Sequence, residues 1–94
     1  MKPPVSRHLT ITGTVQGVGY RWSMIAEATR LGLDGWVRNR RDGSVEALAH
    51  GDEGALAQLA DWARGGPAGA VVDAVAIWES QESPPQGFHQ HSTV

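Results

Sequence analysis

Cysteine is absent from this sequence of 94 residues, so the chain can form neither a disulfide framework nor a thiolate metal site. A chain of this length holds one hydrophobic core, which must be stabilised by packing. We therefore expect a single domain over residues 1–94, in the reducing environment of the cytoplasm. Two segments are expected to be flexible: Met1 to about Ser6, and the stretch rich in serine, proline and glutamine from Ser80 to Gly87.

Long apolar runs are also missing. No stretch approaches the ~18–20 apolar residues that a membrane span requires. The first residues, Met1-Lys2-Pro3-Pro4, lack the apolar segment of a signal peptide. The sequence therefore predicts a protein without a targeting signal and without a membrane partner.

Basic charge is scarce, because eight Lys and Arg residues stand against ten Asp and Glu residues, for a formal net charge of −2. Seven of the eight basic residues lie in the first 50 residues. The N-terminal half of the chain is too weakly basic to form a nucleic-acid surface, but its positive charge suffices to attract a small anion. An RNA-binding sheet would also need a run resembling R-G-F-G-F, and none is present. We expect a small, negatively charged partner and no nucleic acid.

Apolar residues recur with two different periods along the chain. Alternation with polar residues is typical of a half-buried strand, and steps of three and four residues are typical of an amphipathic helix. Asp42-Gly43 adds a β-hairpin signal, and Gly32 a left-handed helix cap. In chain order we expect a strand at 7–15, a loop at 16–19, a helix at 22–31, strands at 35–39 and 44–50, a helix at 52–64, a strand at 72–79 and a last strand at 88–92.

The order β-α-β-β-α-β, with the last strand as an optional final piece, is that of the split βαβ, or ferredoxin-like, arrangement. We therefore predict an α+β sandwich in which two helices cover one face of a four- to five-stranded antiparallel sheet. The four tryptophans fall at periodic positions, and we interpret them as packing residues or partly exposed cover rather than as a stacking platform. The apolar face of the first helix is expected to hold Trp22, Ile25 and Ala28, with Met24 and Leu31.

Several familiar sites can be excluded. The only lysine is Lys2, so no Walker A loop exists, and no serine lies in a nucleophile elbow. His89 and His91 share one face of the last predicted strand, but solvated histidines near the chain end are favoured over a metal site. We expect no metal.

The loop from Val15 to Arg21 is the best candidate for chemistry, because its backbone N–H groups and the following helix N-terminus can converge on an anion. The guanidinium of Arg21 offers a planar fork of donors that matches phosphate oxygens. Asn39 ends a predicted strand, and its amide can hold a water molecule. The alternatives are a plain glycine turn with a surface arginine, and a turn-forming asparagine beside Asp42-Gly43.

Two segments together are similar to the signatures of the acylphosphatase family. The first, Gly13-Thr14-Val15-Gln16-Gly17-Val18-Gly19-Tyr20-Arg21, resembles the family's G-x-V-Q-G-V-x-F/Y-R loop. The second, Gly35-Trp36-Val37-Arg38-Asn39, resembles its G-W-V-R-N segment. The chain departs from the family near its end, where Phe88 is followed by His89-Gln90-His91 and an apolar residue is usual two places after the phenylalanine.

The resemblance implies an acylphosphate phosphohydrolase that splits the carboxyl-phosphate anhydride of small-molecule acyl phosphates into a carboxylate and inorganic phosphate, without a metal or cofactor. Arg21 would bind phosphate and Asn39 would orient the attacking water. Inorganic phosphate or sulfate would be a product-like ligand, and we expect a monomer. The phosphate-binding residues would be Val15, Gln16, Gly17, Val18, Gly19, Tyr20 and Arg21. A carboxylate leaving group with a pKa near ~4 needs no catalytic acid, which agrees with the residues present.

Other interpretations stay open at this point. The same loop would serve a non-catalytic ferredoxin-like module that binds a small anion, although such a module has no need of the amide of Asn39. A fragment similar to the acylphosphatase-like domain of hydrogenase maturation proteins is disfavoured, because the chain spans one domain. Arg38, Arg40 and Arg41 are interpreted as a solvated face rather than as steering charges. No residue for the acyl group is identifiable, so we expect broad selectivity.

Overall fold

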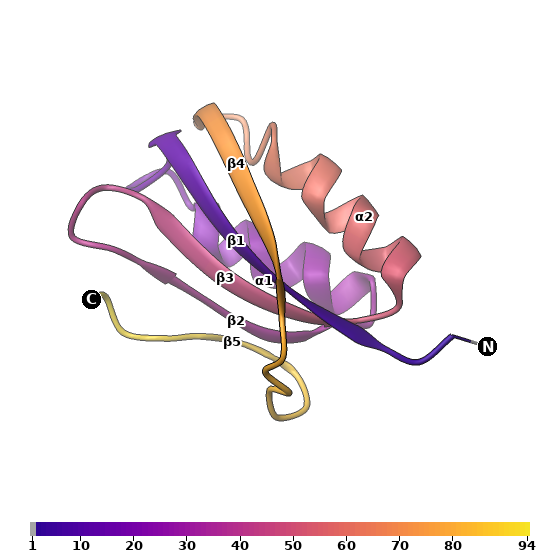
Figure 1. The fold of residues 1–94 in the computed structure, drawn as a ribbon. Helices are drawn as coiled ribbons and strands as arrows, with labels where there is room; N and C mark the ends of the chain where they lie inside the picture. The colour runs from indigo at the N-terminus through magenta and orange to yellow at the C-terminus, as the bar shows by residue number, and fades with distance from the viewer. Residues whose placement is uncertain (1) are drawn as a thin grey trace.

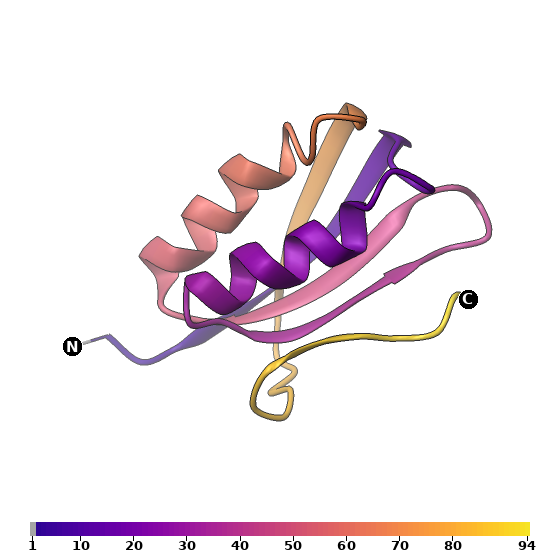
Figure 2. The ribbon, with the colours of Figure 1, turned by 180° about the vertical axis from the view of Figure 1, so that it is seen from behind.

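Two helices cover one face of a five-stranded sheet in the computed structural model of the chain, which describes residues 2–94 (Figure 1). In the view from behind, both helices lie in front of the strands (Figure 2). Within the described residues, neither helix is long and apolar enough to cross a membrane. The elements in chain order are β1 (Val5–Thr14), α1 (Tyr20–Arg30), β2 (Asp34–Asn39), β3 (Val45–Gly51), α2 (Glu53–Ala63), β4 (Val71–Ser80) and β5 (Phe88–Gln90).

The strand order across the sheet is β4-β1-β3-β2-β5, and the predicted ferredoxin-like fold is confirmed. Strand β3 pairs antiparallel with both β1 and β2. Strands β1 and β2 therefore run in the same direction on either side of β3. As a consequence, the loop that follows β1 and the last residue of β2, Asn39, lie at the same edge of the sheet. The candidate site is built at that edge.

The core forms between the sheet and the two helices. In β1 and β3, alternate side chains such as Leu9, Ile11 and Val45 are fully buried against the helices. From α2, Leu56 and Leu59 pack against them. Burial of such side chains stabilises the fold by roughly 1.5–3 kcal/mol each.

Helix α1 packs against the sheet largely through the predicted face, but Trp22 is not part of that face. It begins at Tyr20, and its buried side chains are Tyr20, Met24 and Ala28, which are spaced four residues apart. Trp22, expected on the apolar face, is instead 77% exposed. The other four residues predicted on this face are buried or pack against the core, so only Trp22 was assigned wrongly. The hydroxyl of Tyr20 donates a hydrogen bond to the Ala63 carbonyl oxygen and joins the start of α1 to the end of α2.

Glycines in the two family-like segments have a packing role. A Cβ at Gly13 would lie 2.2 Å from the Val71 carbonyl oxygen, and one at Gly35 would lie 1.8 Å from the Leu48 carbonyl oxygen. Real Cβ atoms do not approach so closely, so both positions require glycine for the close approach of neighbouring strands.

Strand β5 differs from the prediction in direction and in length. It pairs parallel with β2, whereas an antiparallel sheet was expected, and it ends at Gln90 rather than near residue 92. The link over residues 81–87 stays at the end of the sheet where β4 finishes, so the chain returns in the direction of β2 (Figure 1). Beyond Gln90, the His91 N–H donates to the Val37 carbonyl oxygen and the Val94 N–H donates to that of Asn39. These bonds hold the last residues beside the end of β2.

The two segments expected to be flexible overlap ordered elements. Strand β1 begins at Val5, and Ser6 is buried, so these two residues belong to the sheet; Met1 lies outside the described residues. Ser80 ends β4, and the link that follows it is hydrogen-bonded to the sheet at two points. The Ser6 hydroxyl donates to the Glu82 carbonyl oxygen, and the Gly87 N–H donates to a carboxylate oxygen of Asp34.

Candidate active site

The N-terminus of α1 is open toward the end of the sheet. Gly17 and Gly19 both have left-handed backbone angles, with φ of 75° and 80°, and Gly19 is the residue that precedes the helix. No side chain of residues 2–94 caps this helix end, and its first turn holds no acidic residue. The N–H groups of the first turn are therefore available to an external acceptor, and the helix dipole favours an anion there.

A cavity of about 120 Å³ lies at this helix end. Its lining combines residues from the β1–α1 loop, the first turn of α1, the end of β2 and β5. A water molecule takes up about 30 Å³ in the liquid, so the cavity has room for a group of several heavy atoms such as a phosphate. The lining residues are Val15, Gly17, Gly19, Tyr20, Arg21, Trp22, Asn39 and Gln90.

Arg21 and Asn39, which were predicted as the two functional side chains, meet in this cavity. Among residues 2–94, the guanidinium of Arg21 makes no hydrogen bond and no ion pair, so its donors are free to bind a ligand. The side-chain amide of Asn39 likewise has no partner within this part of the chain, whereas its backbone is fixed by pairing with Val45 and by the bond from Val94. A fixed backbone with an unoccupied side chain suits a residue that orients a ligand.

The side chains of Gln16, Val18 and Tyr20 have structural roles in the loop. The amide of Gln16 donates to the carbonyl oxygens of Arg40 at 2.7 Å and of Ser44 at 2.8 Å, and so fastens the loop to the β2–β3 hairpin. Val18 packs against the core, and the buried phenol of Tyr20 has a raised pKa because burial disfavours its charged form. These three predicted residues can therefore contact a phosphate only through their backbone.

Replacing Gln16 by alanine is expected to lower the free energy of unfolding by about 1–3 kcal/mol, because two hydrogen bonds are lost, although each carbonyl oxygen keeps a backbone donor. The loop also loses its tie to the hairpin that carries Asn39, so we expect the inhibition constant of inorganic phosphate to rise. Urea unfolding and phosphate inhibition measure the two effects. Gln58→Ala, at an exposed position on α2, is the matched control. If Gln16→Ala matched this control in both measurements, the fastening role would be wrong.

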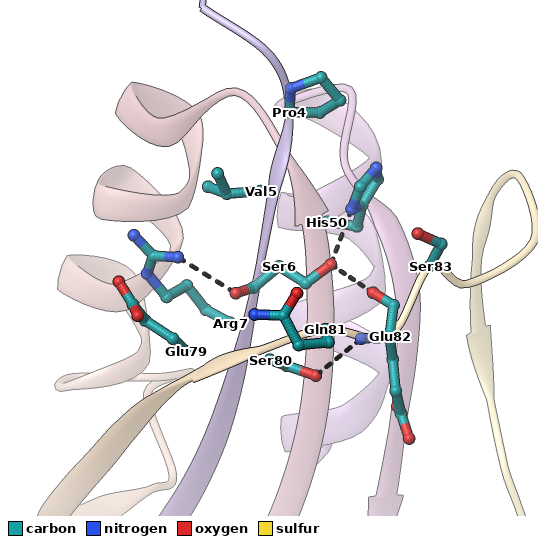
Figure 3. Close-up of a pocket in the computed structure, with 10 residues that line it drawn as sticks. All are labelled: Pro4, Val5, Ser6, Arg7, His50, Glu79, Ser80, Gln81, Glu82 and Ser83. Atoms are coloured by element: carbon teal, nitrogen blue, oxygen red, sulfur yellow. Dashed lines mark hydrogen bonds between the residues drawn. The ribbon is translucent and has the colours of Figure 1, made fainter.

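A larger cavity of about 270 Å³ lies at the opposite edge of the sheet, beside the start of β1 (Figure 3). There the Ser6 Oγ lies 2.7 Å from the His50 Nδ1, which resembles a nucleophile with its base. The Ser6 hydroxyl, however, donates its only proton to the Glu82 carbonyl oxygen. His50 Nδ1 must then donate to Ser6 and cannot act as its base. This contact holds the link after β4 to the sheet and provides no activated nucleophile.

Of the three arginines beside Asn39 that were predicted to form a solvated face, Arg41 is exposed, but the other two pair with a carboxylate. Arg38 Nε donates to Glu46 Oε1 at 2.7 Å, and Arg40 donates to the same oxygen at 3.0 Å. His8 Nε2 lies 2.7 Å from Glu46 Oε2. Because Glu46 alternates with the core residues of β3, this cluster lies on the sheet face away from the helices. Arg38 and Arg40 are thus both bound to Glu46, and neither lines the cavity.

The cluster predicts how stability depends on pH. Burial alone would raise the pKa of Glu46, but hydrogen bonds from Arg38, His8 and Arg40 outweigh it and lower the pKa below its ordinary value of 4.5. A lowered pKa in the folded state stabilises the protein above the unfolded-state pKa, and this contribution is lost as the pH falls through the folded-state pKa. We therefore expect Glu46→Gln to lower the free energy of unfolding by about 1–3 kcal/mol near pH 6.

The difference between parent and Glu46→Gln should shrink as the pH is lowered from about 4.5 toward 3, because the carboxyl group becomes protonated in the parent. Urea unfolding at several pH values measures it. Glu79→Gln, at an exposed position on β4, should change stability by no more than about 0.5 kcal/mol. A parent-to-variant difference that stayed constant from pH 6 to pH 3 would contradict the lowered pKa.

Two residues that line the cavity were not identified from the sequence as site residues. Trp22 directly follows Arg21, and Gln90 comes from β5. Adjacency to Arg21 was a signal for Trp22, whereas the position of Gln90 depends on the direction of β5. His89 and His91, weighed as a metal site, are both exposed, and the His91 ring stacks on Trp36 at 5.2 Å. Within residues 2–94, no three His, Cys, Asp or Glu side chains are grouped so that they could hold a metal ion.

Comparison with known proteins gives one consistent family. The acylphosphatase family model matches residues 7–90. An acylphosphatase of Acidovorax sp. (strain JS42) is 53% identical over 90 residues, which cover 96% of this chain and 93% of that protein. An acylphosphatase of Thermococcus kodakarensis is 52% identical over 79 residues, covering 83% and 87% of the two chains. The solved structure of an acylphosphatase from Coxiella burnetii superimposes with a TM-score of 0.91 at 34% identity and covers 95% of this chain and 94% of its own.

Proposed function

This chain belongs to the acylphosphatase family, and from that premise we propose that it hydrolyses the carboxyl-phosphate anhydride bond of acyl phosphates by direct attack of water. One observation supports the roles that we assign to individual residues. Arg21 and Asn39, from separate elements, line one cavity at an uncapped helix N-terminus, and neither side chain has another partner among residues 2–94. The products are a carboxylate and inorganic phosphate.

The loop from Gln16 to Arg21 surrounds the phosphoryl group. Its backbone N–H groups and the first turn of α1 face the anion, and Arg21 donates to two of the phosphate oxygens. Phosphoryl transfer requires positioning of the reactants and neutralisation of the charge on the equatorial oxygens, and little covalent work by the protein. The open helix end and the free guanidinium support this role.

Asn39 orients the attacking water. Its amide oxygen accepts a hydrogen bond from the water, and its amide nitrogen can donate one, so that the water oxygen is aimed at phosphorus. The attacking and leaving oxygens then lie in line, with the acyl group on the far side. The carboxylate leaves without protonation because its pKa is near ~4, so no general acid is needed.

The alternative of a non-catalytic module that binds a small anion accounts for the loop and Arg21 only. It gives no role to Asn39, which lines the same cavity and whose side-chain amide has no partner in the described chain. Three relatives that are 52–53% identical are named acylphosphatases, which also favours catalysis. Under the catalytic proposal, inorganic phosphate and sulfate bind as product-like ligands. The proposal also includes a monomeric state and a cytoplasmic location. The location is supported by the lack of cysteine, since such a chain gains nothing from an oxidising compartment.

Phosphate release from benzoyl phosphate tests the proposal. The purified protein should consume the substrate and release one equivalent of inorganic phosphate, with added phosphate as a competitive inhibitor. A chelator should leave the rate unchanged. If benzoyl phosphate bound in competition with phosphate but was not hydrolysed, the non-catalytic alternative would be supported. If the chelator lowered the rate of hydrolysis, a metal would take part in the reaction.

A further inference from the structure

Trp22 is the tryptophan that the fold does not use. The rings of Trp36, Trp62 and Trp78 each lie against another ring: His91, Tyr20 and His8 respectively. Among residues 2–94, Trp22 has no such aromatic partner, and 77% of its surface is exposed. An indole left open to water at this position is not explained by packing of the core.

Trp22 lies beside the proposed phosphate site, where part of a bound substrate can reach it. It follows Arg21 in the first turn of α1 and lines the same cavity. That cavity measures about 120 Å³. A cavity of about 150 Å³ takes one benzene molecule, so a phosphoryl group together with an aryl ring exceeds the space available. The acyl group of a bound substrate must therefore project through the mouth of the cavity, where exposed Trp22 and exposed Gln90 lie.

We propose that Trp22 binds the acyl group, and that aromatic acyl phosphates are the preferred substrate class of this enzyme. This inference rests on the proposed function, because it presumes that the phosphoryl group is held by Arg21 and the loop. An indole offers a large apolar face and a π-system that stacks on a second ring, and it costs little conformational entropy to order. The proposal replaces the broad selectivity expected from the sequence, where no residue for the acyl group was found.

Trp22 makes similar contacts with substrate and transition state, because the acyl ring lies away from the reacting phosphorus. Loss of such uniform binding raises KM and leaves kcat nearly constant. The effect applies to substrates that carry a ring and spares those that carry a methyl group. The ratio of kcat/KM for benzoyl phosphate to kcat/KM for acetyl phosphate therefore reports on Trp22.

Steady-state kinetics with these two substrates test the proposal. They are measured for the parent, Trp22→Ala, Trp22→Phe and Trp78→Ala. In Trp22→Ala the ratio should fall about tenfold, which corresponds to about 1.4 kcal/mol, mainly through KM for benzoyl phosphate. Trp22→Phe should keep the ratio within about twofold of the parent, because a ring remains to stack. Trp78→Ala removes an exposed tryptophan from β4, outside the cavity, and should leave the ratio unchanged.

An unchanged ratio in Trp22→Ala, or an equal loss for both substrates, would overturn the role of Trp22, since a merely structural residue affects both substrates alike. The two levels of the proposal fail differently. A parent that released phosphate from neither substrate would remove the proposed function and the inference with it. A parent that hydrolysed both, with the ratio intact in Trp22→Ala, would remove the inference alone.

Discussion

Arg21→Ala is expected to lower kcat/KM for benzoyl phosphate by on the order of 10²–10³ or more, the size typical of removing one donor to a transition state. The guanidinium lines the cavity and is bound to no other group among residues 2–94, so its loss removes ligand contacts without breaking contacts of the fold. Both substrate and transition state carry a phosphate charge, so KM should rise and kcat should fall.

Two further variants sharpen this prediction. Arg21→Lys keeps the charge but not the planar fork, and should recover only part of the activity. Arg41→Ala removes an exposed arginine from the neighbouring hairpin and should keep nearly full activity. Parental kinetics in Arg21→Ala, with urea unfolding showing a folded protein, would mean that another group neutralises the phosphate.

Asn39→Ala is expected to lower kcat on the order of 10²-fold and to change KM less. A positioned water contributes mainly in the transition state, and water that is no longer oriented attacks less often from the productive direction. The fold should persist, because Asn39 pairs with Val45 and accepts from Val94 through its backbone alone.

Inorganic phosphate separates the two roles. Its inhibition constant should stay within a few-fold of the parental value in Asn39→Ala and rise strongly in Arg21→Ala, because the phosphate oxygens contact Arg21 and the loop. If Asn39→Ala raised the inhibition constant as much as Arg21→Ala did, Asn39 would be a phosphate ligand and not the residue that orients water.

The meeting of Arg21 and Asn39 could be predicted from the sequence because it follows from strand direction. Two strands that are connected through a helix and flank a shared antiparallel strand run parallel to each other, so their C-terminal ends lie at the same edge of the sheet. The pairing of Arg38 with Glu46 was predictable in principle as well, since the two residues lie directly opposite each other in the β2–β3 register. Interpreting the arginines by themselves, as a charge run, missed it.

Trp22 and Gln90 show where sequence reasoning stopped. Trp22 fits the three-residue spacing of an apolar helix face, and only the start of α1 at Tyr20 decides that the four-residue row is buried. For Gln90, the segment after Phe88 has no apolar alternation, and strand β5 contains 3 residues. Its direction depends on the path of the link over residues 81–87, which local pattern does not specify.

A crystal structure of the protein grown with inorganic phosphate tests the central claim most directly. We expect the anion at the N-terminus of α1, with the loop N–H groups and the guanidinium of Arg21 on its oxygens and a water between the anion and the amide of Asn39. Phosphate bound elsewhere, for example in the cavity beside Ser6 and His50, with the helix end unoccupied, would contradict the account.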